Sequence, residues 1–79
     1  MNVMQTITYF MFRRKANAPE LGEYHTFDIA VYGQLWREPV TVLRDVALDG
    51  DLVFRMVRTF NRCHLSPLHL KDAVLDMLE

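Results

Sequence analysis

A chain of 79 residues with a formal net charge of −1 is long enough for one small domain and has no charge excess to hold a polyanion. Cys63 is the single cysteine, so no disulfide can form within the chain, and an unpaired thiol favours a reducing compartment. The longest apolar stretch, Met1 to Phe12, is interrupted by polar residues and falls short of the roughly 20 that a membrane span needs. The basic residues Arg13 to Lys15 follow this stretch, whereas a signal peptide has its positive charges first. We therefore expect a cytoplasmic protein without a membrane contact.

The first part of the chain has the composition of β-strands. Residues 3–12 are rich in β-branched and aromatic side chains and contain no Gly or Pro, which predicts a first strand. Charge, Pro19 and Gly22 then indicate an exposed loop over residues 13–23. Apolar and polar residues alternate from Tyr24 to Tyr32, which predicts a second, half-buried strand.

A third strand is expected after a tight turn at Gly33 and Gln34. It runs from about Trp36 to Val46, and Pro39 favours an edge position or a strand start because it cannot donate a ladder hydrogen bond. The alternation places Val40, Val42 and Val46 on one face, and Thr41 and Asp45 on the other. Short connections favour antiparallel pairing of the three strands.

The last 30 residues have a helical pattern instead. Asp49 and Asp51 suit a helix N-terminus, and four apolar residues follow at the spacing of one helix face: Val53, Met56, Val57 and Phe60. Ser66 and Pro67 predict the start of a second helix, whose inner stripe is Leu70, Val74, Met77 and Leu78. Strands followed by helices predict an α+β domain over residues 1–79, with a three-stranded antiparallel sheet and two C-terminal helices packed on one face.

The C-terminal third carries a motif of spaced residues: Asn61, Ser66, Pro67, His69, Leu70, Asp72, Val74, Asp76 and Leu78. It resembles the ending of a family of short uncharacterised proteins from clostridial-type Firmicutes, which close on Asn, a short spacer and Ser-Pro-x-His-Leu-x-Asp-Val-Val-Glu-Asp-x-Leu. Ala73 and Leu75 stand where that pattern has Val and Glu. Upstream, Asp45-Val46 followed by Asp49 is similar to the family's acidic entry to the first helix. The resemblance implies relatives but no assigned activity.

Three residues of the second helix form the first candidate site. His69, Asp72 and Asp76 share a helix face, and an Asp can orient a His for proton transfer. Because no nucleophile, Gly-rich loop or pair of oxyanion donors accompanies them, a structural role is favoured, with the His69 ring near the Ser66 backbone or Asp72. A small enzyme using His69 and Asp72 is the less favoured alternative.

The residues at the helix junction could bind a metal ion or fill the core. Cys63, His64 and His69 have ligand atoms, but they lack the spacing and the number of ligands of a structural zinc site. We expect no metal and no cofactor. Cys63 is expected to fill the core, since free cysteine is among the most buried residue types.

Arg55, Arg58 and Arg62 form a stripe on the first helix opposite its apolar face. Such a stripe could hold phosphates or an acidic partner, although a solvated face is the more common meaning of this pattern. Trp36 beside Arg37 could anchor a partner, because both residue types are enriched at interface hot spots, or it could close one end of the core.

The function favoured by these features is a small protein-interaction or regulatory module that forms a homodimer or binds an unidentified protein. Hydrophobic residues make up 51% of the chain, and the first strand has large apolar groups on both faces. Val3, Ile7, Tyr9 and Met11 point one way, whereas Met4, Phe10 and Phe12 point the other, so one of the two sets should face outwards. The competing account is that the loop over residues 13–23 folds back over this face. Nucleic-acid binding through the arginine stripe is the alternative, and the net charge makes it the weaker one.

Overall fold

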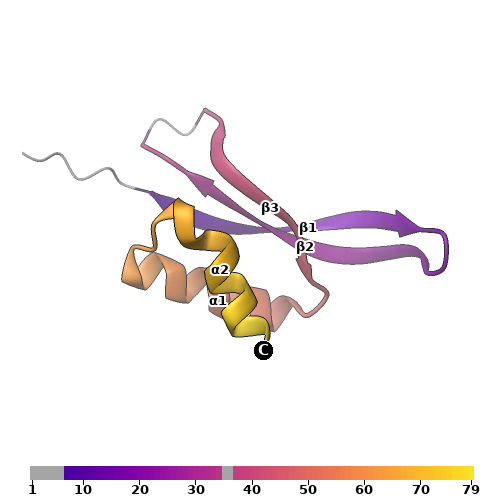
Figure 1. Cartoon of the computed structure of the whole chain (residues 1–79). Helices are drawn as coiled ribbons and strands as arrows, with labels where there is room; N and C mark the ends of the chain where they lie inside the picture. The colour runs from indigo at the N-terminus through magenta and orange to yellow at the C-terminus, as the bar shows by residue number, and fades with distance from the viewer. Residues whose placement is uncertain (1–6, 35–36) are drawn as a thin grey trace, which may run out of the picture.

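The computed structural model describes residues 7–34 and 37–79. Its elements are β1 (Thr8–Ala18), β2 (Gly22–Tyr32), β3 (Pro39–Ala47), α1 (Gly50–Cys63), a 3-10 turn (Pro67–His69) and α2 (Leu70–Leu78). The strands form an antiparallel sheet in the order β1-β2-β3, and both helices lie on one face of it (Figure 1). The α+β fold predicted from the sequence is confirmed. Within the described residues, no helix is long and apolar enough to cross a membrane.

The predicted loop over residues 13–23 is wrong, because β1 and β2 continue their pairing through most of it. The two strands stay in register down to the pair Ala18 and Gly22, and a turn of three residues, 19–21, joins them. Gly22 has a φ of 68°, which a glycine adopts without strain at the end of the turn. The charged residues that suggested a loop lie along this ribbon, where Lys15 and Glu23 pair at 3.3 Å. Residues 15–25, the hairpin arm, extend past the helices (Figure 1).

The predicted faces of β3 are confirmed for Val40 and Val42, which share one face, but are wrong for Val46, because the strand bulges at Asp45. Phe27 pairs with Ala47 and Ile29 with Leu43, so residues 44–46 lie opposite a single residue of β2. Asp45 takes a φ of 57° within this bulge, a conformation that Asp tolerates better than most residues. Leu43 and Val46 therefore both pack against the core, whereas Val40 and Val42 lie on the opposite face of the sheet.

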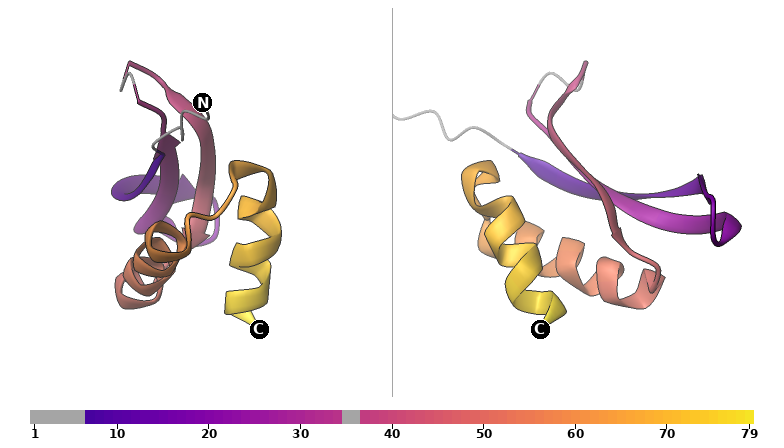
Figure 2. Two further views of the ribbon diagram at one scale, coloured as in Figure 1. Left: turned by 90° about the vertical axis from the view of Figure 1, so that its left-hand side faces the viewer. Right: turned by 45° about the vertical axis from the view of Figure 1, so that its right-hand side comes forward.

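The core lies between the sheet and the two helices, whose arrangement as two layers is seen in Figure 2. Its buried side chains come from four elements: Tyr9, Ile29, Val31, Val53, Met56, Phe60, Leu70 and Val74. Three of the four residues predicted for the apolar face of α1 are fully buried, and Val57 packs against them. Each buried apolar side chain of this size contributes about 1.5 to 3 kcal/mol of transfer free energy.

The two helices begin differently. Asp49 caps α1 as predicted, and its Oδ1 accepts hydrogen bonds from the backbone N–H groups of Asp51 and Leu52 at 3.0 and 3.3 Å. Ser66 caps the 3-10 turn rather than α2, with its Oγ 3.4 Å from the backbone nitrogen of Leu68. The α2 helix starts three residues later than predicted, at Leu70. Leu78, placed in the inner stripe by the sequence, remains 43% exposed.

Candidate interaction surfaces

The predicted arginine stripe lies on the outer side of α1. Arg55, Arg58 and Arg62 are exposed, whereas the residues on the opposite side of the helix face the sheet. In the described part of the chain, the ion pairs are Arg14 with Asp28 and Lys15 with Glu23. The three arginines of α1 therefore have no acidic partner there.

The second candidate group is exposed and unconnected. His69, Asp72 and Asp76 are all on the surface, and no hydrogen bond or ion pair joins them within residues 7–34 and 37–79. His69 instead donates its backbone N–H to the carbonyl oxygen of Ser66 at 2.9 Å, as part of the 3-10 turn. Trp36 lies outside the described residues.

The prediction that Cys63 fills the core is wrong, because its side chain is exposed. At the helix junction Leu65 packs against the core instead. The chain turns between the two residues at His64, which has a φ of 52° and ends α1. Across the described residues, no three His, Cys, Asp or Glu side chains are grouped closely enough to hold a metal ion.

The sheet face opposite the helices carries apolar side chains on all three strands, which we call the outer patch: Phe10, Phe12, Tyr32, Val40 and Val42. Phe10 pairs with Ala30 and Ala30 with Val42, so the patch crosses all three strands. The ring of Phe10 lies 5.7 Å from that of Tyr32 and 6.4 Å from that of Phe12. Phe12 is 46% exposed and Val42 40% exposed.

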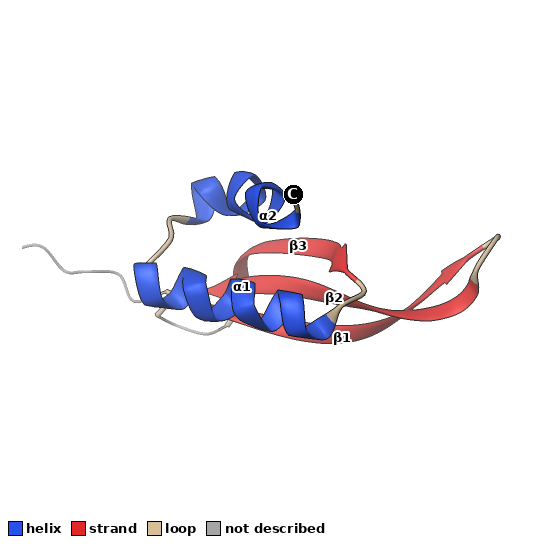
Figure 3. Ribbon diagram, turned by 90° about the horizontal axis from the view of Figure 1, so that it is seen from below, coloured by secondary structure: helices blue, strands red, loops and turns tan. Residues whose placement is uncertain are grey.

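For the described members of the first strand, the outer patch agrees with the prediction that one apolar set faces away from the helices. Val3 and Met4 lie outside the described residues. The competing prediction was that residues 13–23 fold back over this face. The structure contradicts it, because those residues form the hairpin arm and its turn. Figure 3 shows the arm running on in the line of the sheet rather than over its face.

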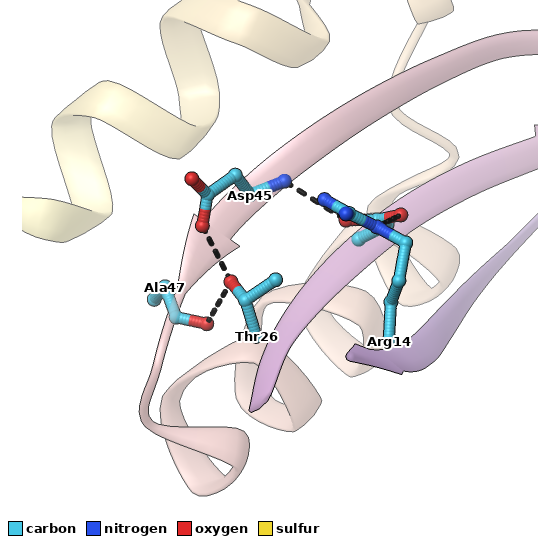
Figure 4. Close-up of polar contacts among 5 residues, drawn as sticks. Arg14, Thr26, Asp45 and Ala47 are labelled. Carbon is cyan, nitrogen blue, oxygen red and sulfur yellow. Dashed lines mark hydrogen bonds and ion pairs between the residues drawn. The ribbon is translucent and has the colours of Figure 1, made fainter. Parts of the chain in front are cut away.

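A polar cluster borders the outer patch and consists of Arg14, Thr26, Asp28 and Asp45 (Figure 4). The Asp28 carboxylate accepts hydrogen bonds from Arg14 Nε at 2.8 Å, from Arg14 Nη2 at 3.2 Å and from the Asp45 backbone N–H at 2.9 Å. The Thr26 hydroxyl donates to Asp45 Oδ1 at 2.6 Å. These bonds hold the bulge of β3 against the central strand.

The charge of Asp28 is stabilised by its neighbours. Burial alone would raise the pKa of this carboxyl, but the hydrogen bonds from Arg14 and Asp45 and the charges of Arg14 and Arg44 outweigh it. The pKa of Asp28 is therefore below its ordinary value. The hydrogen bond to Asp28 also raises the pKa of the Arg14 guanidinium.

Each edge of the sheet is interrupted at particular residues. On β1, the Asn61 side chain accepts from the backbone N–H of Tyr9 at 2.7 Å and donates to its carbonyl oxygen at 3.0 Å, as a neighbouring strand would. On β3, Pro39 has no N–H and the bulge at Asp45 interrupts the regular spacing. Asn61 belongs to the motif found in the sequence, and the structure gives it this role at the edge of β1.

Sequence reasoning missed the polar cluster, the contact of Asn61 with the edge of β1 and the bulge at Asp45, whereas it placed Pro39 at an edge or a strand start, where the structure has it. The one available signal was Asp28, a charged residue in the middle of a strand that the alternation of residues 24–32 predicts. No protein-family model, no curated protein and no solved structure matches this chain. The resemblance of residues 61–78 to the clostridial family therefore stays a prediction.

Proposed function

We propose that this protein is a small interaction module that self-associates by placing its outer patch against the same patch of a second copy. The observation that carries the proposal is the apolar surface across all three strands, on the face that the helices leave open. Contiguous apolar surfaces of this kind mark interaction sites, because their exposure to water is unfavourable. A chain of 79 residues also buries a smaller fraction of its surface on folding than a larger domain does, so association would add to its stability.

The charges beside the patch favour a second copy as the occupant. In a twofold dimer each patch meets its own equivalent, so a patch with a net charge would repel itself. Here Arg14 and Arg44 balance Asp28 and Asp45, and Arg14 is already bound to Asp28. The border of the patch is therefore neutral and can lie against the same border of a second copy without repulsion.

The face is a better contact than either edge of the sheet. Edge-to-edge pairing needs a row of free backbone N–H and C=O groups. Asn61 occupies those of Tyr9 on β1, and Pro39 and the bulge at Asp45 shorten the regular edge of β3. We therefore expect two sheets packed face to face, with the helices on the outside of the pair.

Gel filtration with light scattering tests the proposal. The wild-type chain should give twice its monomer mass of 9.3 kDa, whereas Phe12→Lys and Val42→Lys should each give 9.3 kDa. Leu21→Lys is the matched control, because Leu21 is even more exposed but lies in the turn of the hairpin arm. A wild-type mass of 9.3 kDa across the whole peak would contradict the proposal, as would a loss of association in the control.

A further inference from the structure

We infer that a second copy also docks on the helical side of the molecule, through two stripes of opposite charge on α1 and α2. The basic stripe consists of Arg55, Arg58 and Arg62. The acidic stripe consists of Asp72, Asp76 and Glu79, the last being the C-cap residue of α2. All six side chains are exposed.

The two stripes do not neutralise each other within one chain. The ion pairs of the described residues involve the sheet and the hairpin arm, and none joins α1 to α2. Both helices lie on one face of the sheet (Figure 3), and the register of the strands places the outer patch on the other face. Each copy therefore presents a positive and a negative helix surface on the same side of the molecule.

The spacing of the charges fits an antiparallel approach of α1 to α2 of another copy. Along α1 the arginines are separated by three and then four residues, and along α2 the acids read backwards from Glu79 have the same order. With a rise of about 1.5 Å per residue, both stripes are about 10 Å long. Arg55 then lies opposite Glu79, and Arg62 opposite Asp72. A parallel approach would place the middle pair one residue out of register.

The apolar neighbours of the stripes agree with this direction. Phe54 is 53% exposed beside the basic stripe, and Leu75 is exposed beside the acidic stripe. Successive residues of an α-helix are rotated by about 100° about its axis. Seen along each helix from its N-terminus, Phe54 and Leu75 therefore lie to the same side of their stripes. Two antiparallel helices facing each other bring these sides together. The contact thus combines charge pairs with an apolar border.

A second copy fits these stripes better than a nucleic acid does. The chain has a net charge of −1, which disfavours the binding of a polyanion. Arg14 and Lys15, two other cations of the chain, are already paired with acids. The same chain carries an acidic stripe that has the same length as the basic stripe and the opposite charge. A twofold arrangement would use both stripes of each copy, giving two equivalent contacts.

Charge reversal of each stripe provides the test. One variant combines Arg55→Glu, Arg58→Glu and Arg62→Glu, and the other combines Asp72→Arg, Asp76→Arg and Glu79→Arg. Glu and Arg have similar helix propensities, so circular dichroism should show both variants folded. At about 0.01 M salt, where the Debye length is about 30 Å, wild type should exceed the mass of the outer-patch dimer, and at about 1 M it should return to it.

Each variant alone should lack the salt-sensitive association, and an equimolar mixture of the two should restore it. The control chain combines Glu20→Arg, Glu23→Arg and Glu38→Arg, which gives it the same net charge as the α2 variant but keeps both stripes, so it should keep the salt-sensitive association. Loss of this association in the control chain, or none in the test mixture, would overturn the inference. So would duplex DNA binding lost in the α1 variant without rescue by mixing, which would make the stripe a nucleic-acid site.

The test separates this contact from the outer patch. Val42→Lys should abolish the salt-resistant dimer and leave the salt-sensitive association, whereas the stripe variants should do the reverse. Surface ion pairs contribute little individually, so the salt-sensitive contact should be the weaker of the two. If Val42→Lys removes both forms of association, the stripes do not bind a second copy independently and the inference fails.

Discussion

The two faces of β2 are buried equally well by different means. On the inner face Ile29 and Val31 are covered by the helices, and no polar partner is needed. On the outer face Thr26, Asp28 and Ala30 are also buried, with Asp28 6% exposed, although both helices lie on the other side. Ala30 is short enough to be screened by its flanking strands, and the two polar residues are covered by Arg14 and the bulge of β3. The inner face therefore depends on packing volume, and the outer face on hydrogen-bond geometry.

The largest effect should come from the inner face, at Phe60. Its ring lies between α1 and the sheet, 5.6 Å from the ring of Tyr9 in an edge-to-face arrangement. Phe60→Ala should lower the free energy of unfolding by about 3 to 5 kcal/mol, because the cavity cannot be refilled by neighbours that are themselves fixed. Phe54→Ala on the same helix is the control and should cost well under half as much, since that ring is exposed. Equal losses in urea titrations would show that α1 does not pack as described.

An intermediate effect is expected from the outer face, at Asp28. Asp28→Asn keeps the shape of the side chain, and its amide oxygen can still accept from the Asp45 N–H and Arg14 Nη2. Its NH₂ group then faces Arg14 Nε, a donor that has lost its acceptor. Leaving such groups unsatisfied costs about 1 to 3 kcal/mol, and the partial exposure of Arg14 places the value in the lower part of that range. Glu23→Gln, which breaks the exposed pair with Lys15, should cost less than about 1 kcal/mol.

The pH dependence of stability gives a second measurement on the same residue. The pKa of Asp28 is lower in the folded state than its ordinary value, so its contribution is complete above about pH 4 and is lost as the pH falls through the folded value. The difference in unfolding free energy between wild type and Asp28→Asn should therefore narrow in acid. A difference that stays constant from neutral to acidic pH would remove the charge of Asp28 from the explanation.

The sequence predicted the features that depend on neighbours along the chain. The cap at Asp49, the buried side of α1 and the order of strands and helices all follow from local spacing. The hairpin arm and the polar cluster were missed, because both depend on the register set by the turn at residues 19–21. That register places Arg14 within reach of Asp28, and no pattern within a single strand indicates it.

The candidate surfaces also differ in how far they could be predicted from the sequence. The arginine stripe could be identified from helical spacing, and the structure places it on the surface. The outer patch could be anticipated for β1 but not for β3, since the bulge at Asp45 decides which valines face outwards. Residues of the motif near the C-terminus suggested a site around His69, yet the structure gives the most definite role to Asn61, in a contact between α1 and β1.

The smallest expected effect on stability is at Val42, and its neighbour Leu43 provides the contrast. Val42→Thr exchanges side chains of nearly the same shape at an exposed position of β3, so the unfolding free energy measured with dilute protein should change by no more than about 0.5 kcal/mol. Leu43→Thr brings a hydroxyl against the core and should cost about 1 to 3 kcal/mol. For self-association the order should reverse, because the hydroxyl introduced by Val42→Thr would lie in the proposed contact, whereas Leu43 faces the helices. If Val42→Thr dimerises with the same affinity as wild type, the outer face is not the contact. That conclusion would hold even if Leu43→Thr lowers the unfolding free energy as expected.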